Sequence, residues 1–133
     1  MLAMVQISNE ELIRRAQSVL KPRKMKNGCS AGDVGCALIT NKGNVYLGVS
    51  IDTCCGMGFC AEHSAIAAMV THGEHVIQKI VAVSGHGILS PCGRCREFMH
   101  QIHEENSEAE VLIRSNKSVK LKDLLPFPWD AEN

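Results

Sequence analysis

Residues 60–95 read CAEHSAIAAMVTHGEHVIQKIVAVSGHGILSPCGRC, and this stretch decides the fold. The alanine-rich part that starts at Cys60 predicts a buried helix, which Gly73 closes. The apolar run within Ile77–Ser84 is typical of a strand that is covered on both faces. After a loop, a second helix is predicted from about Cys92. Together these elements have the length of a crossover unit, so the starts of the two helices can meet at one end of a sheet.

The segments on either side add a helix, a hairpin and a further strand. Ser8 and Glu11 form a capping box, which predicts the start of a helix. The sequence Asn-Lys-Gly-Asn at 41–44 has turn chemistry and lies between two apolar runs, which indicates a β-hairpin. The alternation of strands and helices indicates a three-layer α/β domain around one sheet. The predicted elements are helices over about 8–21, 60–72 and 92–102, strands over 35–40, 45–49, 77–84 and 109–114, a helical turn over 121–125 and an extended tail over 126–133.

The composition is that of one globular domain spanning residues 1–133. The chain has a mass of 14.5 kDa, with 45% hydrophobic and 21% charged residues. Fourteen Lys and Arg residues balance fourteen Asp and Glu residues, which argues against a nucleic acid polymer as partner. No apolar run approaches the ~20 residues of a membrane span. Residues 1–7 lack the basic and apolar parts of a secretory signal, so we expect a cytoplasmic protein.

Seven cysteines are many for a chain of this size, and three of them stand at predicted helix starts. These are Cys60, Cys92 and Cys95, and a helix N-terminus stabilises a thiolate. Because the crossover brings the two helix starts together, the three thiolates can converge. Zinc takes three protein ligands and a water when its site is catalytic. Glu62, two residues after Cys60, is close enough to exchange a proton with such a water without binding the metal.

Two other interpretations of these cysteines stay open at this point. The Cys-x-x-Cys pair alone also fits a redox pair at a helix start, although that interpretation leaves Glu62 without a role. A purely structural zinc site would need a fourth protein ligand instead. The candidates for that ligand are Cys54, Cys55 and His63.

The two cysteine motifs resemble the zinc signature of the cytidine deaminase family. That signature consists of Cys-Ala-Glu, here at 60–62, and Pro-Cys-Gly-x-Cys, here at 91–95. The segment GILSPCGRCR at 87–96, and the ending Leu-Leu-Pro at 124–126 followed by Trp129, resemble the blasticidin S deaminase branch most. The resemblance runs from about residue 10 to Trp129 and includes a highly specific double motif.

This resemblance implies an α/β fold, a three-layer α-β-α cytidine-deaminase-like domain with one mixed central sheet. It implies that Cys60, Cys92 and Cys95 bind Zn²⁺ and that Glu62 is the catalytic proton shuttle. Family members hydrolyse the exocyclic amine of a cytosine ring to a carbonyl and release ammonia. The implied partner is a small molecule, a free cytosine nucleoside or an analogue such as blasticidin S, and the implied assembly is a homotetramer. The implied substrate-binding residues are Ser50, Asp52, Ala61, Ser90 and Trp129.

Ser50 and Asp52 depart from the family pattern, in which Asn and Glu at these places hold the ribose hydroxyls. The shorter side chains leave room for a bulkier substituent, so we expect weak use of cytidine. Trp129 fits two roles equally, an anchor of the tail or a cover over the substrate. The alternative function is a non-catalytic zinc-binding relative that binds a nucleoside-like ligand, and the retention of Glu62 argues against it.

Overall fold

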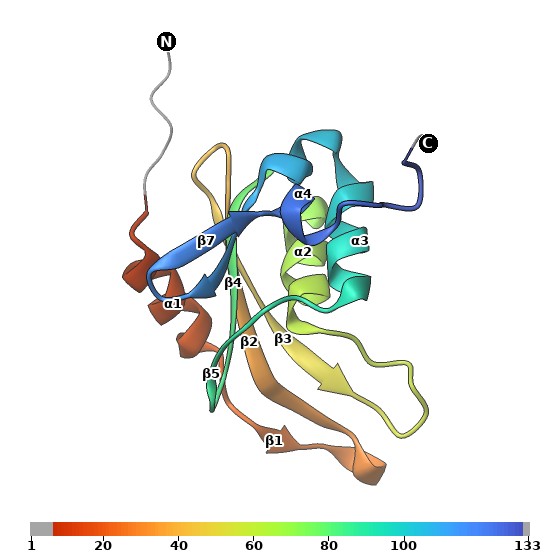
Figure 1. Cartoon of the computed structure of the whole chain (residues 1–133). Helices are drawn as coiled ribbons and strands as arrows, with labels where there is room; N and C mark the ends of the chain where they lie inside the picture. Colours follow the sequence, from red (N-terminus) through yellow and green to blue (C-terminus); the bar gives the residue numbers. More distant parts are fainter. Residues whose placement is uncertain (1–6, 132–133) are drawn as a thin grey trace.

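The computed structural model describes residues 7–131 and is built around one mixed, seven-stranded sheet (Figure 1). The strands are β1 (Arg23–Lys24), β2 (Ser30–Thr40), β3 (Val45–Asp52), β4 (Ile77–Ser84), β5 (Gly87–Leu89), β6 (Glu110–Arg114) and β7 (Lys117–Lys120). The main order is β3, β2, β4, β6, β7. β1 pairs with the start of β2, and β5 pairs with the end of β4. β4 and β6 run parallel, and the other pairings are antiparallel.

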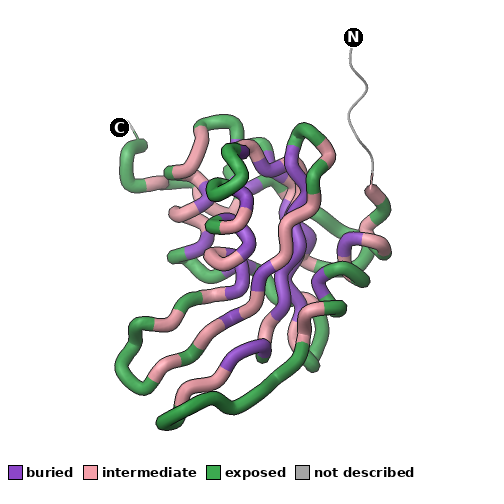
Figure 2. Tube along the Cα trace, turned by 180° about the vertical axis from the view of Figure 1, so that it is seen from behind, coloured by how far each residue is buried: buried purple, intermediate pink, exposed green. Residues whose placement is uncertain are grey.

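Helices cover both faces of this sheet, which confirms the predicted three-layer α-β-α fold. The helices are α1 (Asn9–Ser18), α2 (Ala61–Thr71), α3 (Gly93–Ile102) and the short α4 (Leu121–Leu124), with 3₁₀ turns η1 (Lys26–Gly28) and η2 (Glu104–Glu108). α1 packs on one face, and the other three α-helices pack on the opposite face. Alternation along β2 serves both layers, because Cys36 and Leu38 face α2 whereas Ala37 and Ile39 face α1. Figure 2 shows the buried residues gathered in the central strands and on the inner sides of the helices.

The helix starts lie where the sequence predicts them. The Ser8 hydroxyl accepts a hydrogen bond from the Glu11 N–H at 3.0 Å, as a capping box requires. α2 and α3 begin directly after Cys60 and Cys92, which are their N-cap residues. α1 ends at Ser18, before the predicted end near residue 21. The crossover of helix, strand and helix between the two cysteine motifs is therefore confirmed.

Three short strands, β1, β5 and β7, are absent from the prediction. They have only two, three and four residues, which is too short to display an alternating pattern. β5 occupies a predicted loop, and β7 follows a predicted turn. Each forms because its backbone groups pair with an adjacent longer strand. β2 and β3 also extend beyond the predicted hairpin, to Ser30 and Asp52, and this extension forms part of the site described below.

The C-terminal tail turns back beside α3 instead of running extended from residue 126. The N–H of Ala131 donates to the Pro128 carbonyl at 3.0 Å, which closes a turn. The N–H of Trp129 donates to the Glu97 carboxylate at 3.0 Å. Residues 132–133 of the tail, and residues 1–6, for which the sequence predicts no secretory signal, lie outside the described residues.

Gly48 in β3 allows α2 to approach the sheet closely. A Cβ atom at this position would lie 2.3 Å from the backbone nitrogen of Ala65 and 2.6 Å from the carbonyl oxygen of Ala61. Both distances are shorter than van der Waals contact, so any side chain here would displace the helix. Because Ala61 directly follows Cys60, the small size of Gly48 fixes where the first turn of α2 lies.

We expect Gly48→Ala to lower the free energy of unfolding by about 1–3 kcal/mol, the usual cost of overpacking. Urea denaturation would measure this loss. Gly85→Ala is the matched control, since a Cβ atom there meets nothing within 4 Å, and its effect should stay within about 0.5 kcal/mol. Equal effects of the two substitutions would contradict the role of Gly48.

Candidate active site

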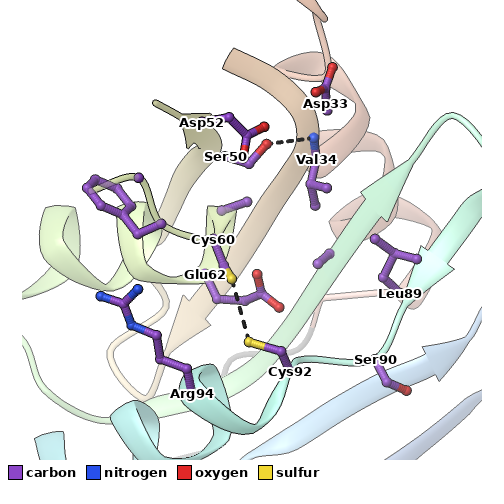
Figure 3. A pocket seen from close by; sticks show the side chains of 14 residues that line it. Asp33, Val34, Ser50, Asp52, Cys60, Glu62, Leu89, Ser90, Cys92 and Arg94 are labelled. Carbon is purple, nitrogen blue, oxygen red and sulfur yellow. Dashed lines mark hydrogen bonds between the residues drawn. The ribbon is translucent and has the colours of Figure 1, made fainter. Parts of the chain in front are cut away.

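Three thiol groups meet where α2 and α3 begin. Cys60 and Cys92 cap the two helices, and Cys95 lies in the first turn of α3. The Sγ atom of Cys92 lies 3.5 Å from that of Cys60 and 3.6 Å from that of Cys95. All three sulfur atoms lie within 4.8 Å of one another. Figure 3 shows the side chains of Cys60 and Cys92 pointing toward each other from separate elements. The structure thus brings together the three thiols that the sequence singled out.

The surroundings of the three thiols differ in how they favour a negative charge. Burial, and then the neighbouring Cys92 thiol, raises the pKa of Cys60. Burial, and then the charge of Glu62, raises the pKa of Cys95. Burial also opposes ionisation of Cys92, but the Cys95 N–H and the adjacent thiols outweigh it and lower the pKa of Cys92. Ionising all three together therefore calls for a cation among them, and a bound metal provides it.

The spacing of the thiols fits a tetrahedral zinc ion. With Zn–S bonds of about 2.3 Å, tetrahedral sulfur ligands lie about 3.8 Å apart. The observed separations of 3.5 and 3.6 Å are close to this value. Within residues 7–131, these thiols are the one group of His, Cys, Asp and Glu side chains close enough to hold an ion. Three protein ligands leave a fourth position for water, as in catalytic zinc sites.

Glu62 lies in the first turn of α2, next to these thiols, and is only 6% exposed. Figure 3 shows its carboxylate directed into the same pocket as the side chains of Cys60 and Cys92. Burial raises the pKa of Glu62 above its usual value, although hydrogen bonding to its own backbone and to Cys95 partly opposes this. A carboxyl group held in such an environment is suited to accept and return a proton.

Cys60, Cys92 and Glu62 line one side of a pocket of about 400 Å³, within the range typical of small-molecule sites. Its opposite side is formed by the extended ends of β2 and β3 (Figure 3). The loop between β3 and α2 and the segment after β5 complete the lining. Besides Cys60, Glu62 and Cys92, the lining consists of Asp33, Val34, Ser50, Asp52, Gly58, Phe59, Ala61, Ala82, Leu89, Ser90 and Arg94.

Four of the five implied substrate-binding residues line this pocket, and Trp129 does not. Ser50, Asp52, Ala61 and Ser90 all contribute to the lining. The hydroxyl of Ser50 accepts a hydrogen bond from the Val34 N–H at 3.0 Å, so it also joins β3 to β2. Trp129 is 71% exposed and lines a separate hollow near the end of α3. The turn at the end of the chain holds it there, so within one chain Trp129 does not cover the pocket.

Asp33 is a lining residue that the sequence analysis missed. The predicted strand began at residue 35, whereas β2 begins at Ser30. The register between β2 and β3 shifts between Ala31 and Gly35, which indicates a β-bulge, and Asp33 lies inside it. A bulge re-aims side chains locally, and no alternating pattern in the sequence reveals one. Asp33 in β2 therefore lines the pocket, as Asp52 in β3 does (Figure 3).

One arginine lies inside the Cys92–Cys95 motif and another directly follows it, and only the first lines the pocket. Arg94 lines the pocket, and its positive charge acts on the neighbouring His63. Arg96 donates instead to the carbonyl oxygens of Pro91 and Leu124, at 2.8 and 3.1 Å. Arg94 thus belongs to the pocket lining, whereas Arg96 holds the chain that precedes the Cys92 motif.

The candidates for a fourth metal ligand lie outside the thiol group. Cys54 and Cys55 are exposed in the loop after β3. The Nδ1 atom of His63 is 3.3 Å from the sulfur of Cys95, but His63 does not belong to the group that could hold an ion. Burial, and then the charge of Arg94, lowers the pKa of His63. The geometry thus favours three protein ligands over four.

These features define an α/β protein with a three-thiol metal centre and a buried carboxylate beside it. Residues 7–108 match the model of the cytidine and deoxycytidylate deaminase zinc-binding region. The chain is 34% identical over 103 residues to a cytidine deaminase of Mycobacterium tuberculosis, covering 75% of this chain and 74% of that protein. It is 33% identical over 109 residues to a blasticidin-S deaminase of Bacillus cereus, and the match covers 72% of this chain and 76% of that protein.

Solved structures agree with this match. The crystal structure of the Mycobacterium tuberculosis cytidine deaminase has a TM-score of 0.78 at 25% identity, covering 95% of this chain and all of that one. The crystal structure of the cytidine deaminase of Burkholderia pseudomallei has a TM-score of 0.75 at 27% identity, and the match covers 92% of this chain and all of that one. The chain therefore belongs to the cytidine deaminase family, as its motifs indicated.

Among the described residues, no helix has the length and apolar character needed to span a membrane.

We expect the purified, reduced protein to hold about one zinc ion per chain, and Cys92→Ala to lose it, because two thiols cannot retain zinc as three do. Elemental analysis after dialysis would measure the number of zinc ions per chain in both proteins. The double variant Cys54→Ala, Cys55→Ala is the matched control and should keep its zinc, since both thiols are exposed and outside the cluster. Full zinc retention by the Cys92 variant would refute the three-thiol site.

Proposed function

We propose that this protein is a zinc-dependent hydrolytic deaminase that acts on a free cytosine nucleoside or a cytosine-like analogue. The observation that carries this proposal is the buried carboxylate of Glu62 beside three convergent thiols, at a pocket that Glu62, Cys60 and Cys92 line. A site that only held metal, or only bound a ligand, would have no use for a buried proton-accepting group at that place. Cys60, Cys92 and Cys95 are the proposed zinc ligands, and the whole chain acts as one zinc domain.

In the proposed reaction, the exocyclic amine of the ring is exchanged for a carbonyl oxygen from water, and ammonia is released. When bound, zinc supplies Lewis-acid activation of the attacking water. Glu62 accepts one proton of that water and delivers it to the ring nitrogen N3; it then accepts the second proton, from the hydroxyl group added to the ring, and delivers it to the departing amine, so that the carbonyl forms as ammonia leaves. The raised pKa of the Glu62 carboxyl makes its protonated form easier to reach during this transfer. Arg94 and the N-termini of α2 and α3 offset the negative charge of the thiolates.

The substrate is proposed to be a small molecule and not a polymer. The chain has no net charge, and aromatic residues make up 4% of it, so its composition gives little support to a nucleic acid polymer as substrate. The similarity to both a cytidine deaminase and a blasticidin-S deaminase supports a cytosine ring with a variable substituent. Ser50 and Asp52 are proposed to face that substituent, and Ala61 and Ser90 to contact the ring side of the pocket.

The working assembly is proposed to be a homotetramer in the cytoplasm. Phe127 and Trp129 are 85% and 71% exposed, and such large apolar side chains are commonly covered by a partner subunit. If a neighbouring copy covers them, Trp129 can act at an interface even though it lies away from the pocket of its own chain.

All seven cysteines are free thiols, which suits a reducing compartment such as the proposed cytoplasm.

We expect the protein to release ammonia from at least one of cytidine, deoxycytidine, blasticidin S and free cytosine. Glu62→Gln should keep zinc and bind substrate but lose about 10²–10⁴-fold in kcat, because an amide cannot carry the proton. Ammonia release, zinc content and equilibrium substrate binding would be measured on both proteins. Full activity of the Glu62 variant would refute its role, and binding without turnover by the unaltered protein would favour a non-catalytic relative.

The short side chains of Ser50 and Asp52 lead us to expect weak use of cytidine. The Ser50 hydroxyl already accepts a hydrogen bond from the Val34 N–H, which leaves its own O–H as the donor for a substrate. The double variant Ser50→Asn, Asp52→Glu should raise kcat/KM for cytidine by about tenfold, the value of one added hydrogen bond. The same variant should gain nothing with blasticidin S, which serves as the control. Efficient native use of cytidine, above ~10⁵ M⁻¹s⁻¹, would contradict this expectation.

A further inference from the structure

Asp33 brings a carboxylate without a partner into the pocket. It is exposed, it lies inside the bulge of β2, and it lines the pocket on the side opposite to the thiols. Among the described residues, none donates a hydrogen bond to its side chain or pairs with its charge. The guanidinium group of Arg23, which lies beside Gly32, donates instead to the Lys21 carbonyl at 3.0 Å. The Asp33 carboxylate is therefore free to meet a group that enters the pocket.

Asp52 is a second free carboxylate, on the neighbouring strand β3. It is exposed and lines the same side of the pocket, and no described residue pairs with its side chain. Ser50 stands two residues before it, is only 8% exposed and keeps its own O–H free to donate. This side of the pocket (Figure 3) therefore offers a substrate two carboxylates and a buried hydroxyl group.

The charge of the pocket lining is negative as a whole. Asp33, Asp52 and Glu62 supply three carboxyl groups, and Arg94 is the one basic residue of the lining. Arg94 acts on His63, which belongs to α2, and forms no ion pair with either aspartate in the described chain. Three thiolates around a zinc dication would add one more negative charge. Charges in a partly enclosed pocket are screened less than charges on an open surface, so this lining attracts a cation and repels an anion.

We propose that Asp33 and Asp52 make the pocket specific for cytosine nucleosides whose sugar or sugar-like substituent ends in a positively charged group, such as a protonated amine. The inference rests on the proposed deaminase function, because that function places the cytosine ring beside Glu62 and directs the substituent to the opposite side of the pocket. There an ammonium group would donate charge-assisted hydrogen bonds to the free carboxylates. A phosphate group at the same place would be repelled, so nucleotides are excluded as substrates. Both aspartates are specificity residues and take no part in the proton transfer.

Three nucleosides that differ only in the group at one position separate an effect of charge from a preference for larger substrates. They are cytidine, 5′-amino-5′-deoxycytidine and cytidine 5′-monophosphate, which are neutral, positive and negative at the 5′ position. The kcat/KM for ammonia release would be measured for each, at low and at high salt, with the unaltered protein and with Asp33→Asn. Asp123→Asn is the matched control, because Asp123 is an exposed aspartate of α4 outside the pocket.

We expect the amino nucleoside to exceed cytidine about 10–100-fold in kcat/KM, the value of a hydrogen bond between charged groups, and the monophosphate to fall below cytidine by about tenfold or more. Asp33→Asn should reduce the preference for the amino nucleoside about tenfold, whereas Asp123→Asn should keep it. The preference should also weaken at high salt, since ions screen the carboxylates. Equal use of the three nucleosides by the unaltered protein would overturn the inference, and so would a preference that Asp33→Asn leaves unchanged.

Binding measurements separate a failure of this inference from a failure of the proposed function. The affinity for the three nucleosides would be measured by calorimetry with Glu62→Gln, alone and combined with Asp33→Asn, so that turnover does not interfere. Ammonia release without any charge preference would support the deaminase and overturn the inference. A charge preference in binding, without ammonia release by the unaltered protein from any cytosine compound tested, would support the role of the aspartates and overturn the proposed function. Absence of both binding and release would overturn both.

Discussion

The start of α2 meets the start of α3, and this juxtaposition is the constraint on which the rest of the site depends. The helices come from different parts of the chain and are joined through β4 and β5. Gly48 sets the depth of α2, because a side chain there would collide with the backbone at Ala61 and Ala65. The contact of His63 with Cys95 connects the two helices at the same point. Small movements of either helix would separate sulfur atoms that now lie within 4.8 Å of one another.

Electrostatics explains why this meeting point belongs at helix N-termini. Three thiols and the carboxylate of Glu62 share a small volume. Burial is the main cause that raises the pKa of Cys60, Cys95 and Glu62. Partial positive charge from the first backbone N–H groups of α2 and α3 opposes this tendency. This stabilisation of negative charge is strongest at Cys92, which is the one thiol of the three whose pKa is lowered. The fold thus prepares the site for a dication, and it places Glu62, the proposed proton carrier, beside the thiols.

The features that could be predicted from the sequence are those fixed by local pattern. The helix starts at Cys60 and Cys92, and the strand between them, follow from capping positions and apolar periodicity. Asp33 could not be predicted, because it depends on a β-bulge. The partnership of His63 with Cys95 depends on how two helices cross, and the position of Trp129 depends on a turn in the tail. Such features arise from tertiary packing, which no periodicity encodes.

The central claim is that three cysteines alone hold one zinc ion and leave a fourth position open to water. X-ray absorption spectroscopy of the zinc-loaded protein tests this most directly, since it counts ligands by element and distance. The account predicts three sulfur atoms at about 2.3 Å and one oxygen atom at about 2.0 Å from zinc, without the outer-shell scattering of an imidazole. Four sulfur atoms, or an imidazole in place of the oxygen, would contradict it.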